Sequence, residues 1–228
     1  MAITFTVKTL SNLYIGGTPQ TFEIGGVDMQ TATDDCNGQP YIPASSFKGA
    51  LREIVKDTPN EKIAGYYRQY LINGQSEFES KIKGRSDEIE FKKSYQALID
   101  DNNAHLYLFG IPGFNHAPKL IFNDLKLILE PDTDKPDKWF SIDMKNSIEE
   151  TESNRLKSNP RSYKTARKGL SFAGMITLYQ PQKLSNDAAS VIESYLKNCL
   201  DQFKEGIYRI GNSKSRGYGW IEATVLEG

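Results

Sequence analysis

The chain has 228 residues, of which 38% are hydrophobic, 11% aromatic and 25% charged, as in an ordinary soluble globular protein. This aromatic and aliphatic content excludes a disordered chain, and no stretch approaches the roughly 18 consecutive apolar residues of a membrane span. The first residues lack a signal-peptide pattern, and Cys36 and Cys199 are the only cysteines. We therefore expect a cytoplasmic protein with neither a disulfide framework nor a four-ligand zinc site.

Positive charge is unevenly distributed along the chain. The net charge is −1, from 28 lysines and arginines against 29 aspartates and glutamates. Residues 153–169 nevertheless contain six basic residues and no acidic one, and residues 204–216 form a second basic stretch. Phosphate contacts depend on nearby charge rather than on the total, so these stretches fit either a polyanion-binding surface or ordinary solvated loops.

Hydrophobic periodicity and turn residues divide the chain into a series of predicted elements. In chain order we expect a strand over 2–10, a turn-rich segment over 13–43, a helix through 47–55 with Ser45 and Ser46 as N-cap candidates, a polar and partly helical region over 57–104, a strand over 119–129, a long polar excursion over 131–167, a strand over 169–179, a helix over 184–203 that begins with Ser185, a glycine-rich loop over 206–218 and a strand over 220–226.

The predicted order is strand, helix, strand, strand, helix, strand. This is the pattern of a ferredoxin-like α+β fold, which RNA-recognition domains share (βαββαβ). Two long insertions, at about residues 57–117 and 130–167, extend this core. The sequence contains no internal repeat or linker, so we expect a single domain over residues 1–228.

The first candidate site is a glycine-rich segment that ends in an aspartate. Four glycines, Gly16, Gly17, Gly25 and Gly26, precede Asp28. Glycines permit close backbone approach, and freed amides in such a loop can bind phosphate. A carboxylate at the end of the loop can bind a metal or position a reacting hydroxyl. The alternative is a set of hairpin turns in which Asp28 caps one turn.

The second candidate site leads from a proline-rich segment into the first predicted helix. The first turns of this helix carry Ser45, Ser46, Lys48 and Arg52. Helix N-termini attract phosphate through free amides and the helix dipole, and the lysine adds a positive charge. Lys48 and Arg52 are four residues apart and therefore share one face. A plain capped helix explains the serines equally well but leaves the clustered cations unexplained.

The third candidate site, residues 206–220, interleaves glycine, basic and aromatic residues. This composition is typical of sites that bind RNA phosphates and stacked bases. His105 and His116 lack metal-ligand spacing, and a structural or surface role is the simpler interpretation of both. The sequence contains no nucleophile elbow, Walker loop or dinucleotide fingerprint.

Together these segments resemble the RAMP superfamily of CRISPR-associated proteins. The resemblance rests on Leu-Tyr-Ile-Gly-Gly at 13–17, Ile-Gly-Gly-Val-Asp at 24–28, residues 38–52 and the glycine-rich ending at 207–220. The segments 108–110, 119–124 and 165–172 add to it. The branch that they resemble most is the backbone subunit of type III effector complexes.

The resemblance implies a subunit that binds a CRISPR guide RNA, together with target RNA, other effector subunits and further copies of itself. Asp28 matches the family's aspartate for metal-dependent cleavage of target RNA, so a divalent ion such as Mg²⁺ or Mn²⁺ is implied at Asp28. The basic excursion at 140–167 matches a thumb that kinks the guide–target duplex. The residues implied in RNA binding are Gly16, Gly17, Gly25, Gly26, Ser45, Ser46, Lys48, Arg52, Arg161, Lys164, Arg167, Gly211, Lys214, Arg216 and Gly217.

Several alternatives stay open at the level of sequence. Met-Gln-Thr at 29–31 replaces the Ser-Pro-Val that commonly follows the family's aspartate, and Asp34 and Asp35 are rival metal ligands. Residues 57–104 contain no cysteine, so the zinc site of some relatives is not expected here. The chain fits a non-catalytic structural subunit as well, a repeat-processing endoribonuclease with a histidine base, or a stand-alone RNA-binding module.

Overall fold

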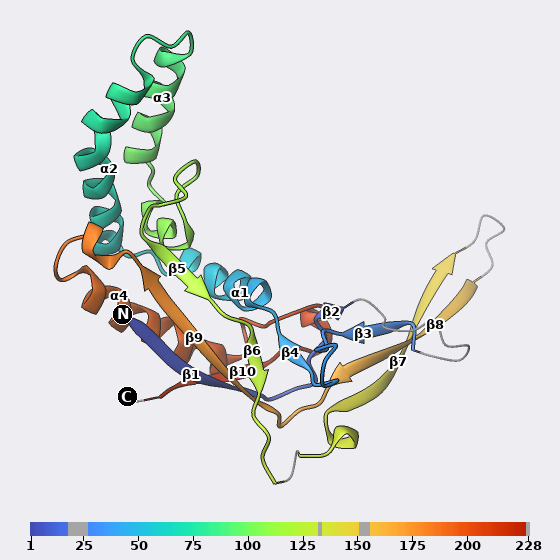
Figure 1. The fold of residues 1–228 in the computed structure, drawn as a ribbon. Coiled ribbons are helices and arrows are strands. Elements are labelled where there is room, and N and C mark those ends of the chain that lie inside the picture. The colour runs from blue at the N-terminus through green and yellow to red at the C-terminus, as the bar shows by residue number, and fades with distance from the viewer. Residues whose placement is uncertain (18–26, 132–133, 151–155, 227–228) are drawn as a thin grey trace. The chain divides into compact units, whose positions relative to one another are not determined.

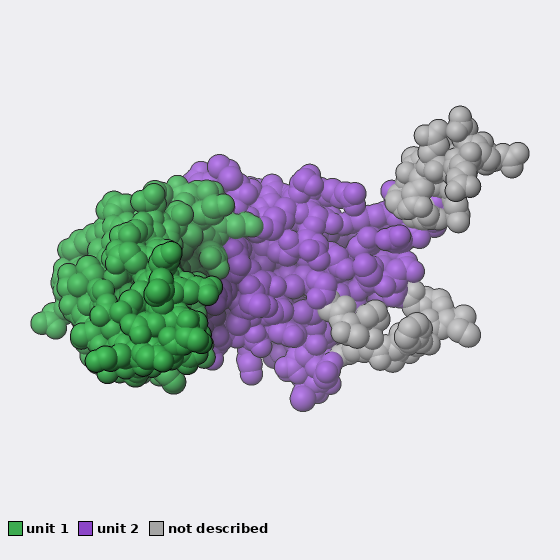
Figure 2. All heavy atoms as spheres, turned by 90° about the horizontal axis from the view of Figure 1, so that it is seen from above, with its two compact units in different colours: residues 1–3, 51–121, 176–199 green, residues 4–50, 122–175, 200–228 purple. Residues whose placement is uncertain are grey.

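The computed structural model describes residues 1–17, 27–131, 134–150 and 156–226. Contacts divide the chain into two compact units, which Figure 2 colours separately. Unit 1 comprises residues 1–3, 51–121 and 176–199, and unit 2 comprises residues 4–50, 122–175 and 200–228. The insertion predicted at about 57–117 supplies most of unit 1.

Among the described residues, six strands form the main sheet, in the order β10-β1-β9-β6-β4 with β5 also paired to β9. The strands are β1 (Ala2–Thr9), β4 (Tyr41–Ile42), β5 (Lys119–Phe122), β6 (Leu125–Leu127), β9 (Ser171–Tyr179) and β10 (Ile221–Val225), as Figure 1 shows. β1 pairs antiparallel with β10, and β6 pairs antiparallel with β9 and β4. The order β10-β1-β9-β6 places the fourth predicted core strand beside the first, then the third and the second, as two interlocked split β-α-β units require. The predicted α+β, ferredoxin-like fold is confirmed.

A second sheet contains the long hairpin of the molecule. Its order is β2-β3-β8-β7. Its strands are β2 (Gly16–Gly17), β3 (Met29–Thr31), β7 (Phe140–Glu150) and β8 (Leu156–Ala166). β7 and β8 pair antiparallel along their whole length, and β3 lies parallel to β8. The polar excursion predicted over 131–167 is therefore largely a β-hairpin. Its first strand alternates apolar and polar residues, but the apolar Ile142 and Met144 are exposed, so the pattern is not that of a strand packed on a core.

Aromatic packing forms part of the core of unit 2. Phe5 of β1 stacks on Phe47 with ring centroids 5.0 Å apart, and Phe47 lies 5.7 Å from Phe203. All three are completely or almost completely buried, and each such ring contributes about 1.5–3 kcal/mol of hydrophobic stabilisation. A Cβ on Gly174 of β9 would lie 2.7 Å from the Phe5 ring. The close packing of β9 on this ring therefore requires glycine at 174.

Helices dominate the described part of unit 1. The α-helices of the chain are α1 (Ala44–Asp57), α2 (Glu61–Ile82), α3 (Glu88–Ile99) and α4 (Ala188–Asp201), and short 3₁₀ helices are η1 (Ala104–Phe109), η2 (Pro136–Lys138), η3 (Pro181–Lys183), η4 (Gln202–Glu205) and η5 (Lys214–Arg216). Asn60 caps α2 by accepting a hydrogen bond from the Ile63 amide at 3.1 Å. No helix in the described ranges is long and apolar enough to cross a membrane.

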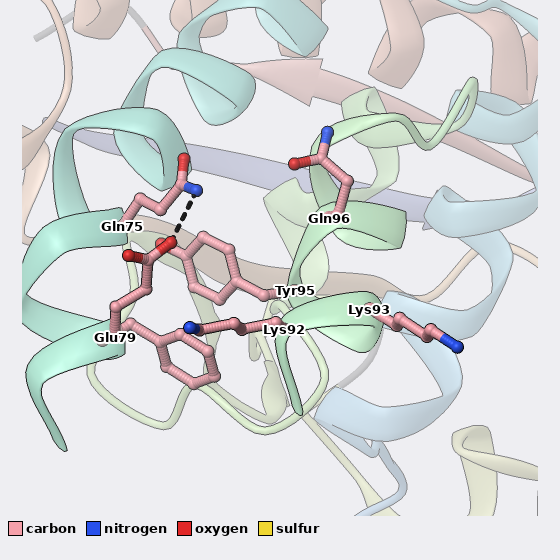
Figure 3. A pocket seen from close by; sticks show the side chains of 7 residues that line it. Gln75, Glu79, Lys92, Lys93, Tyr95 and Gln96 are labelled. Carbon is pink, nitrogen blue, oxygen red and sulfur yellow. Dashed lines mark hydrogen bonds between the residues drawn. The ribbon is translucent and has the colours of Figure 1, made fainter. Parts of the chain in front are cut away.

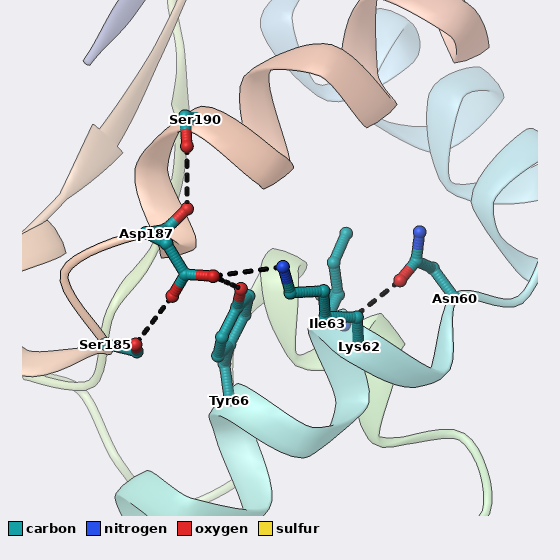
Figure 4. Close-up of polar contacts among 7 residues, drawn as sticks. All are labelled: Asn60, Lys62, Ile63, Tyr66, Ser185, Asp187 and Ser190. Atoms are coloured by element: carbon teal, nitrogen blue, oxygen red, sulfur yellow. Dashed lines mark hydrogen bonds and ion pairs between the residues drawn. The ribbon is translucent and has the colours of Figure 1, made fainter.

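Asp187 fixes the segment before α4 against α2, as Figure 4 shows. Its Oδ2 accepts a hydrogen bond from the Tyr66 hydroxyl at 2.6 Å and lies 3.0 Å from the Lys62 ammonium. Its Oδ1 accepts a hydrogen bond from the Ser185 hydroxyl at 2.6 Å. The bonds from Ser185, Tyr66 and Lys62, in that order, hold the pKa of Asp187 far below its usual value, so the carboxylate stays charged.

Three predicted boundaries differ from the structure. The strand predicted over 119–129 is two strands, β5 and β6, because residues 123–124 interrupt the strand. The Asp124 carboxylate accepts a hydrogen bond from the Ala44 amide at 2.7 Å, so α1 begins before Ser45 and the serines are not its cap. Ser185 donates its hydroxyl to Asp187, and α4 begins at Ala188 rather than at Ser185.

Candidate nucleic-acid interface

Asp28 lies immediately before β3, which lies between β2 and β8 in the second sheet. The parallel register of β3 and β8 pairs Met29 with Tyr163, which brings Asp28 beside Ser162. Its Oδ2 accepts hydrogen bonds from the Ser162 amide at 2.6 Å and the Ser162 hydroxyl at 3.0 Å. The Asp28 amide in turn donates to the Ser162 hydroxyl oxygen at 3.1 Å. The side chain is exposed, but one of its oxygens is held in place.

The charge state of Asp28 suits an electrostatic role. The hydrogen bond from the Ser162 amide, followed by that from its hydroxyl, lowers the pKa of the Asp28 carboxyl, and the Arg161 charge adds to this effect. The carboxylate is therefore ionised at neutral pH. Within the described ranges no group of three His, Cys, Asp or Glu side chains converges on a metal position. A lone carboxylate nevertheless fits Mg²⁺, which proteins often bind through one or two carboxylates while substrate phosphates supply further ligands.

Asp34, a rival ligand in the sequence, has a different role. Its Oδ1 accepts a hydrogen bond from the Cys36 amide at 2.9 Å, which closes the turn that precedes Asn37 and Gly38. Gly38 has a positive φ of 70°, the left-handed conformation that the turn requires. The aspartate at 34 is thus a turn residue.

Asp143 ties the base of the β7–β8 hairpin to the glycine-rich loop at 206–219. Its Oδ2 accepts hydrogen bonds from the Tyr218 hydroxyl at 2.7 Å, the Thr165 hydroxyl at 3.1 Å and the Asn12 amide group at 3.3 Å. Burial raises the pKa of the Asp143 carboxyl, but these hydrogen bonds together with one from Ser141 outweigh it and lower the pKa overall. A charged Asp143 therefore joins three separate parts of unit 2.

Lys145 occupies a cage between the hairpin and the loop. Its ammonium lies 3.9 Å from the Tyr218 ring centroid and 4.5 Å from that of Tyr163, and 3.3 Å from the Ser213 hydroxyl. Burial, then the nearby Arg216 charge, lowers the pKa of Lys145. Two neighbouring cations attract an anion such as phosphate. Lys145 was missed in the sequence because the strand that carries it was missed.

Packing explains two glycines of the loop. Gly211 has a φ of 81°, and a Cβ there would overlap the Tyr14 carbonyl oxygen. Gly219 has a φ of 76°, and a Cβ there would overlap the Ile210 carbonyl oxygen. Gly217 has a φ of 92°, but a Cβ would meet nothing within 4 Å. Glycine at 211 and 219 is thus required by the fold itself, whereas 217 leaves open space.

The basic residues implied in RNA binding are distributed over the hairpin and the loop. Arg161 and Arg167 of this group are exposed, although the Arg167 guanidinium also donates to the Phe140 carbonyl. The Lys164 ammonium lies over the Phe140 ring at 4.3 Å. Lys214 and Arg216 form η5 in the glycine-rich loop.

The remaining predicted residues fall into three groups. Ser45, Ser46 and Lys48 lie in the first turns of α1 within unit 2, and Arg52 follows on the same helix within unit 1. The amide at the start of this helix already binds the Asp124 carboxylate, so an anion there would compete with Asp124. Gly16 and Gly17 form β2, and a Cβ on Gly16 would lie 3.5 Å from the Asn212 side chain. Gly25 and Gly26 lie outside the described residues.

The two histidines belong to unit 1, whereas the hairpin and the glycine-rich loop belong to unit 2. His105 belongs to η1 in unit 1 and is 2% exposed, and burial lowers its pKa. His116 is exposed and also belongs to unit 1. The sequence interpretation of His105 as a structural histidine agrees with its position.

Comparison with known proteins identifies relatives of the chain. It is 24% identical to the CRISPR system Cms endoribonuclease Csm3 of Methanocaldococcus jannaschii, over 95% of this chain and 75% of the relative. It is also 24% identical to the Csm3 of Streptococcus thermophilus, over 97% of this chain and 86% of the relative.

Two solved structures share the fold. Type III-B Cmr-beta bound to cognate target RNA contains a chain with a TM-score of 0.50 and 17% identity; the match covers 99% of this chain but 60% of that one. Cmr-beta in its apo state contains a chain with a TM-score of 0.50 and 12% identity, and the match covers 100% of this chain and 98% of that one. The model of the RAMP superfamily matches residues 6–222. The chain therefore belongs to the RAMP superfamily.

Proposed function

We propose that the protein is a guide-RNA-binding backbone subunit of a type III CRISPR effector complex and cleaves the target RNA that pairs with its guide. The observation that carries the cleavage proposal is the ionised, exposed carboxylate of Asp28, held by Ser162 beside the Arg161 charge. The relatives named as Csm3 endoribonucleases support this reaction class, and the fold shared with a Cmr-beta chain is consistent with it.

RNA binding rests on the cations of unit 2. Arg161 and Lys164 of the hairpin, with Lys145 and Arg216 beside the glycine-rich loop, offer positive charge to a phosphate backbone. Arginine and lysine contacts of this type position a strand and carry no sequence information. The guide would be held by its backbone, as a subunit that accepts guides of any sequence requires.

Cleavage would proceed by in-line attack of a ribose 2′-hydroxyl on the adjacent phosphate. The 2′-oxygen forms a bond to phosphorus as the bond to the 5′-oxygen breaks, which leaves a 2′,3′-cyclic phosphate and a 5′-hydroxyl. Asp28 would hold a divalent ion such as Mg²⁺ or Mn²⁺, or orient the attacking hydroxyl. A bound divalent ion neutralises charge that develops on the phosphate oxygens. Ser162 positions Asp28 through the backbone amide and the hydroxyl, and neighbouring cations hold the phosphates.

The test is target cleavage by the assembled complex with Asp28→Asn. We expect cleavage to be lost while guide content and assembly are retained, because the change keeps the size of the side chain and removes its charge. Asp34→Asn is the matched control. Asp34 accepts a hydrogen bond from the Cys36 amide within a turn, so its replacement should leave cleavage unchanged. Unchanged cleavage with Asp28→Asn would favour the non-catalytic structural subunit. Cleavage of precursor RNA in EDTA, dependent on His116, would favour repeat processing instead.

Ser162→Ala separates positioning from chemistry. This change removes the hydroxyl but keeps the amide, which is the larger cause of the lowered pKa of Asp28. We expect reduced cleavage at neutral pH and an acid limb of the pH–rate profile that moves to higher pH. A purely structural serine would change the amount of active complex without moving that limb.

A further inference from the structure

A groove in unit 1 lies on residues that take no part in the proposed RNA-cleaving site. It has a volume of about 830 Å³ and is lined by α2, α3, residues 112–117 and Lys183. Pockets that hold ligands or partner side chains usually span roughly 300–1,000 Å³. None of the residues implied in RNA binding lines this groove.

Aromatic side chains form the floor of the groove. Phe78 of α2 stacks on Tyr95 of α3 with centroids 4.3 Å apart, and Phe114 packs edge-on against Tyr95 at 5.7 Å. Tyr95 is buried, and its hydroxyl donates to the Leu71 carbonyl at 2.6 Å, so the floor is fixed and its polar group is satisfied. Phe91 extends this apolar surface and is 37% exposed. An aromatic floor of this kind accepts large apolar anchors.

The rim of the groove is positive. Lys81 pairs with Glu77 at 2.6 Å, and the hydrogen bond from Lys81 together with the charge of Lys183 lowers the pKa of Glu77. Lys183 also donates to the His116 carbonyl at 3.1 Å. The charged side chains that line the groove are therefore the two lysines Lys81 and Lys183 and one glutamate, Glu77. Charge complementarity favours an occupant that carries carboxylates.

A second hollow between α2 and α3, of about 280 Å³, lacks these properties. Figure 3 shows that Gln75, Glu79, Lys92 and Lys93 surround it, and Gln75 donates to Glu79 at 2.9 Å. Five of its seven lining residues are charged or carry a side-chain amide, so it offers less apolar surface to a partner than the larger groove does. The larger groove is the one whose floor is formed by aromatic side chains.

We propose that the larger groove binds an amphipathic helix of a partner protein, whose apolar face covers Phe78, Phe91 and Phe114 and whose Asp or Glu residues approach Lys81 and Lys183. Two helices and a loop form a cleft that a third helix fills with anchors at i, i+3 or i+4 and i+7. A nucleic-acid strand suits it less, because the floor rings already pack on one another and the Glu77 carboxylate lies at the rim. This binding site goes beyond the proposed cleavage of RNA and does not depend on it.

Site-specific photo-crosslinking in the protein purified with its associated proteins tests the proposal. A benzophenone amino acid replaces Ser94, an exposed residue of α3 that lines the groove, and in a control replaces Ser76, an exposed residue of α2 that does not. Mass spectrometry identifies the crosslinked peptide. We expect Ser94 alone to capture one protein segment with helical apolar spacing and flanking carboxylates.

A charge reversal adds a second readout. Lys183→Glu should reduce the yield of that crosslink at least fivefold, whereas Lys93→Glu, on α3 outside the groove, should not change it. Crosslinking to RNA, equal capture of the same segment from Ser94 and Ser76, or no protein captured from Ser94 would each overturn the proposal. Retained target cleavage in the Lys183→Glu complex would show that the groove acts apart from the cleavage site.

Discussion

The glycine-rich loop yields the sharpest prediction about stability, at Gly211. Alanine there would keep a φ of 81°, which costs roughly 1–2 kcal/mol for a residue with a Cβ. Its Cβ would also overlap the Tyr14 carbonyl oxygen and approach Ile15 Cγ1 to 3.0 Å, and relief of such overpacking costs about 1–3 kcal/mol more. The movement weakens the hydrogen bond from the Asn212 amide to the Tyr14 carbonyl at 2.8 Å. We therefore expect Gly211→Ala to lose about 2–5 kcal/mol of unfolding free energy.

Gly217→Ala is the matched control. Its φ of 92° imposes the same kind of backbone strain, but its Cβ would meet no atom within 4 Å. We expect a loss of about 1–2 kcal/mol, from the strained φ alone. The difference between the two variants isolates the collision with the residue-14 backbone, because both replace a glycine of the same loop with the same side chain.

Urea unfolding of the two purified variants and the wild-type chain, followed by circular dichroism, measures this difference. The midpoint should fall clearly further for Gly211→Ala than for Gly217→Ala, with similar m-values if the denatured states are alike. Equal midpoints for the two variants would refute the steric explanation. In that case the glycine at 211 would be required for RNA rather than for packing.

Three further changes test the interface and the core. Asp143→Asn should lower the unfolding free energy by about 1–2 kcal/mol at pH 7. The pKa of Asp143 is lower in the folded than in the unfolded chain, so this loss should shrink as the pH falls below about 4 and the native carboxylate becomes protonated. Urea unfolding at neutral and at acidic pH measures it. Lys145→Met keeps the packing between the tyrosine rings but removes the charge, so RNA affinity should fall and the slope of log K against log salt should decrease by about 1 in anisotropy titrations. Burial lowers the pKa of His105 below 6.5, so thermal stability should fall as pH drops from 6.5 through the native pKa; His105→Phe should lack this dependence.

Apolar periodicity was sufficient to predict two helices and the strands of the main sheet other than β4, with β5 and β6 predicted as one strand. β1 alternates buried and exposed residues as its sequence predicted, with Phe5 and Val7 inside. α1 and α4 bury one face each, which includes Phe47 in α1 and Leu196 in α4. Each of these elements has one face in the core, so the burial that shapes it leaves a trace in the residue order.

The β7–β8 hairpin shows a different residue pattern. β7 carries the sequence Phe-Ser-Ile-Asp-Met-Lys, with Ile142 67% and Met144 75% exposed and the polar Asp143 and Lys145 turned toward the loop. The apolar residues of β7 are thus exposed and its polar residues are packed, which is the reverse of a strand that covers a core. The residues that anchor the hairpin could be found only after the strand was known.

The sequence singled out Asp28 as a candidate but could not supply the contacts around it. Asp28 emerged from its position after paired glycines, yet its partner Ser162 lies 134 positions away and belongs to no motif. N-capping of α1 was assigned to neighbouring serines, while the carboxylate that bonds its first amide, Asp124, is 80 positions distant. Local patterns cannot report partners that only the sheet register brings together.

The glycines of the third motif show what such a pattern records. Gly211 and Gly219 lie where backbone passes against backbone, and the Gly219 amide donates to the Asn12 carbonyl at 3.0 Å. A motif rich in glycine can thus mark the packing that shapes a binding loop rather than the contacts that the loop makes. The Lys145 ammonium, which we propose to bind phosphate, comes from β7 and lies outside the motif. A variant at Lys145, rather than at the glycines, should therefore separate RNA binding from folding.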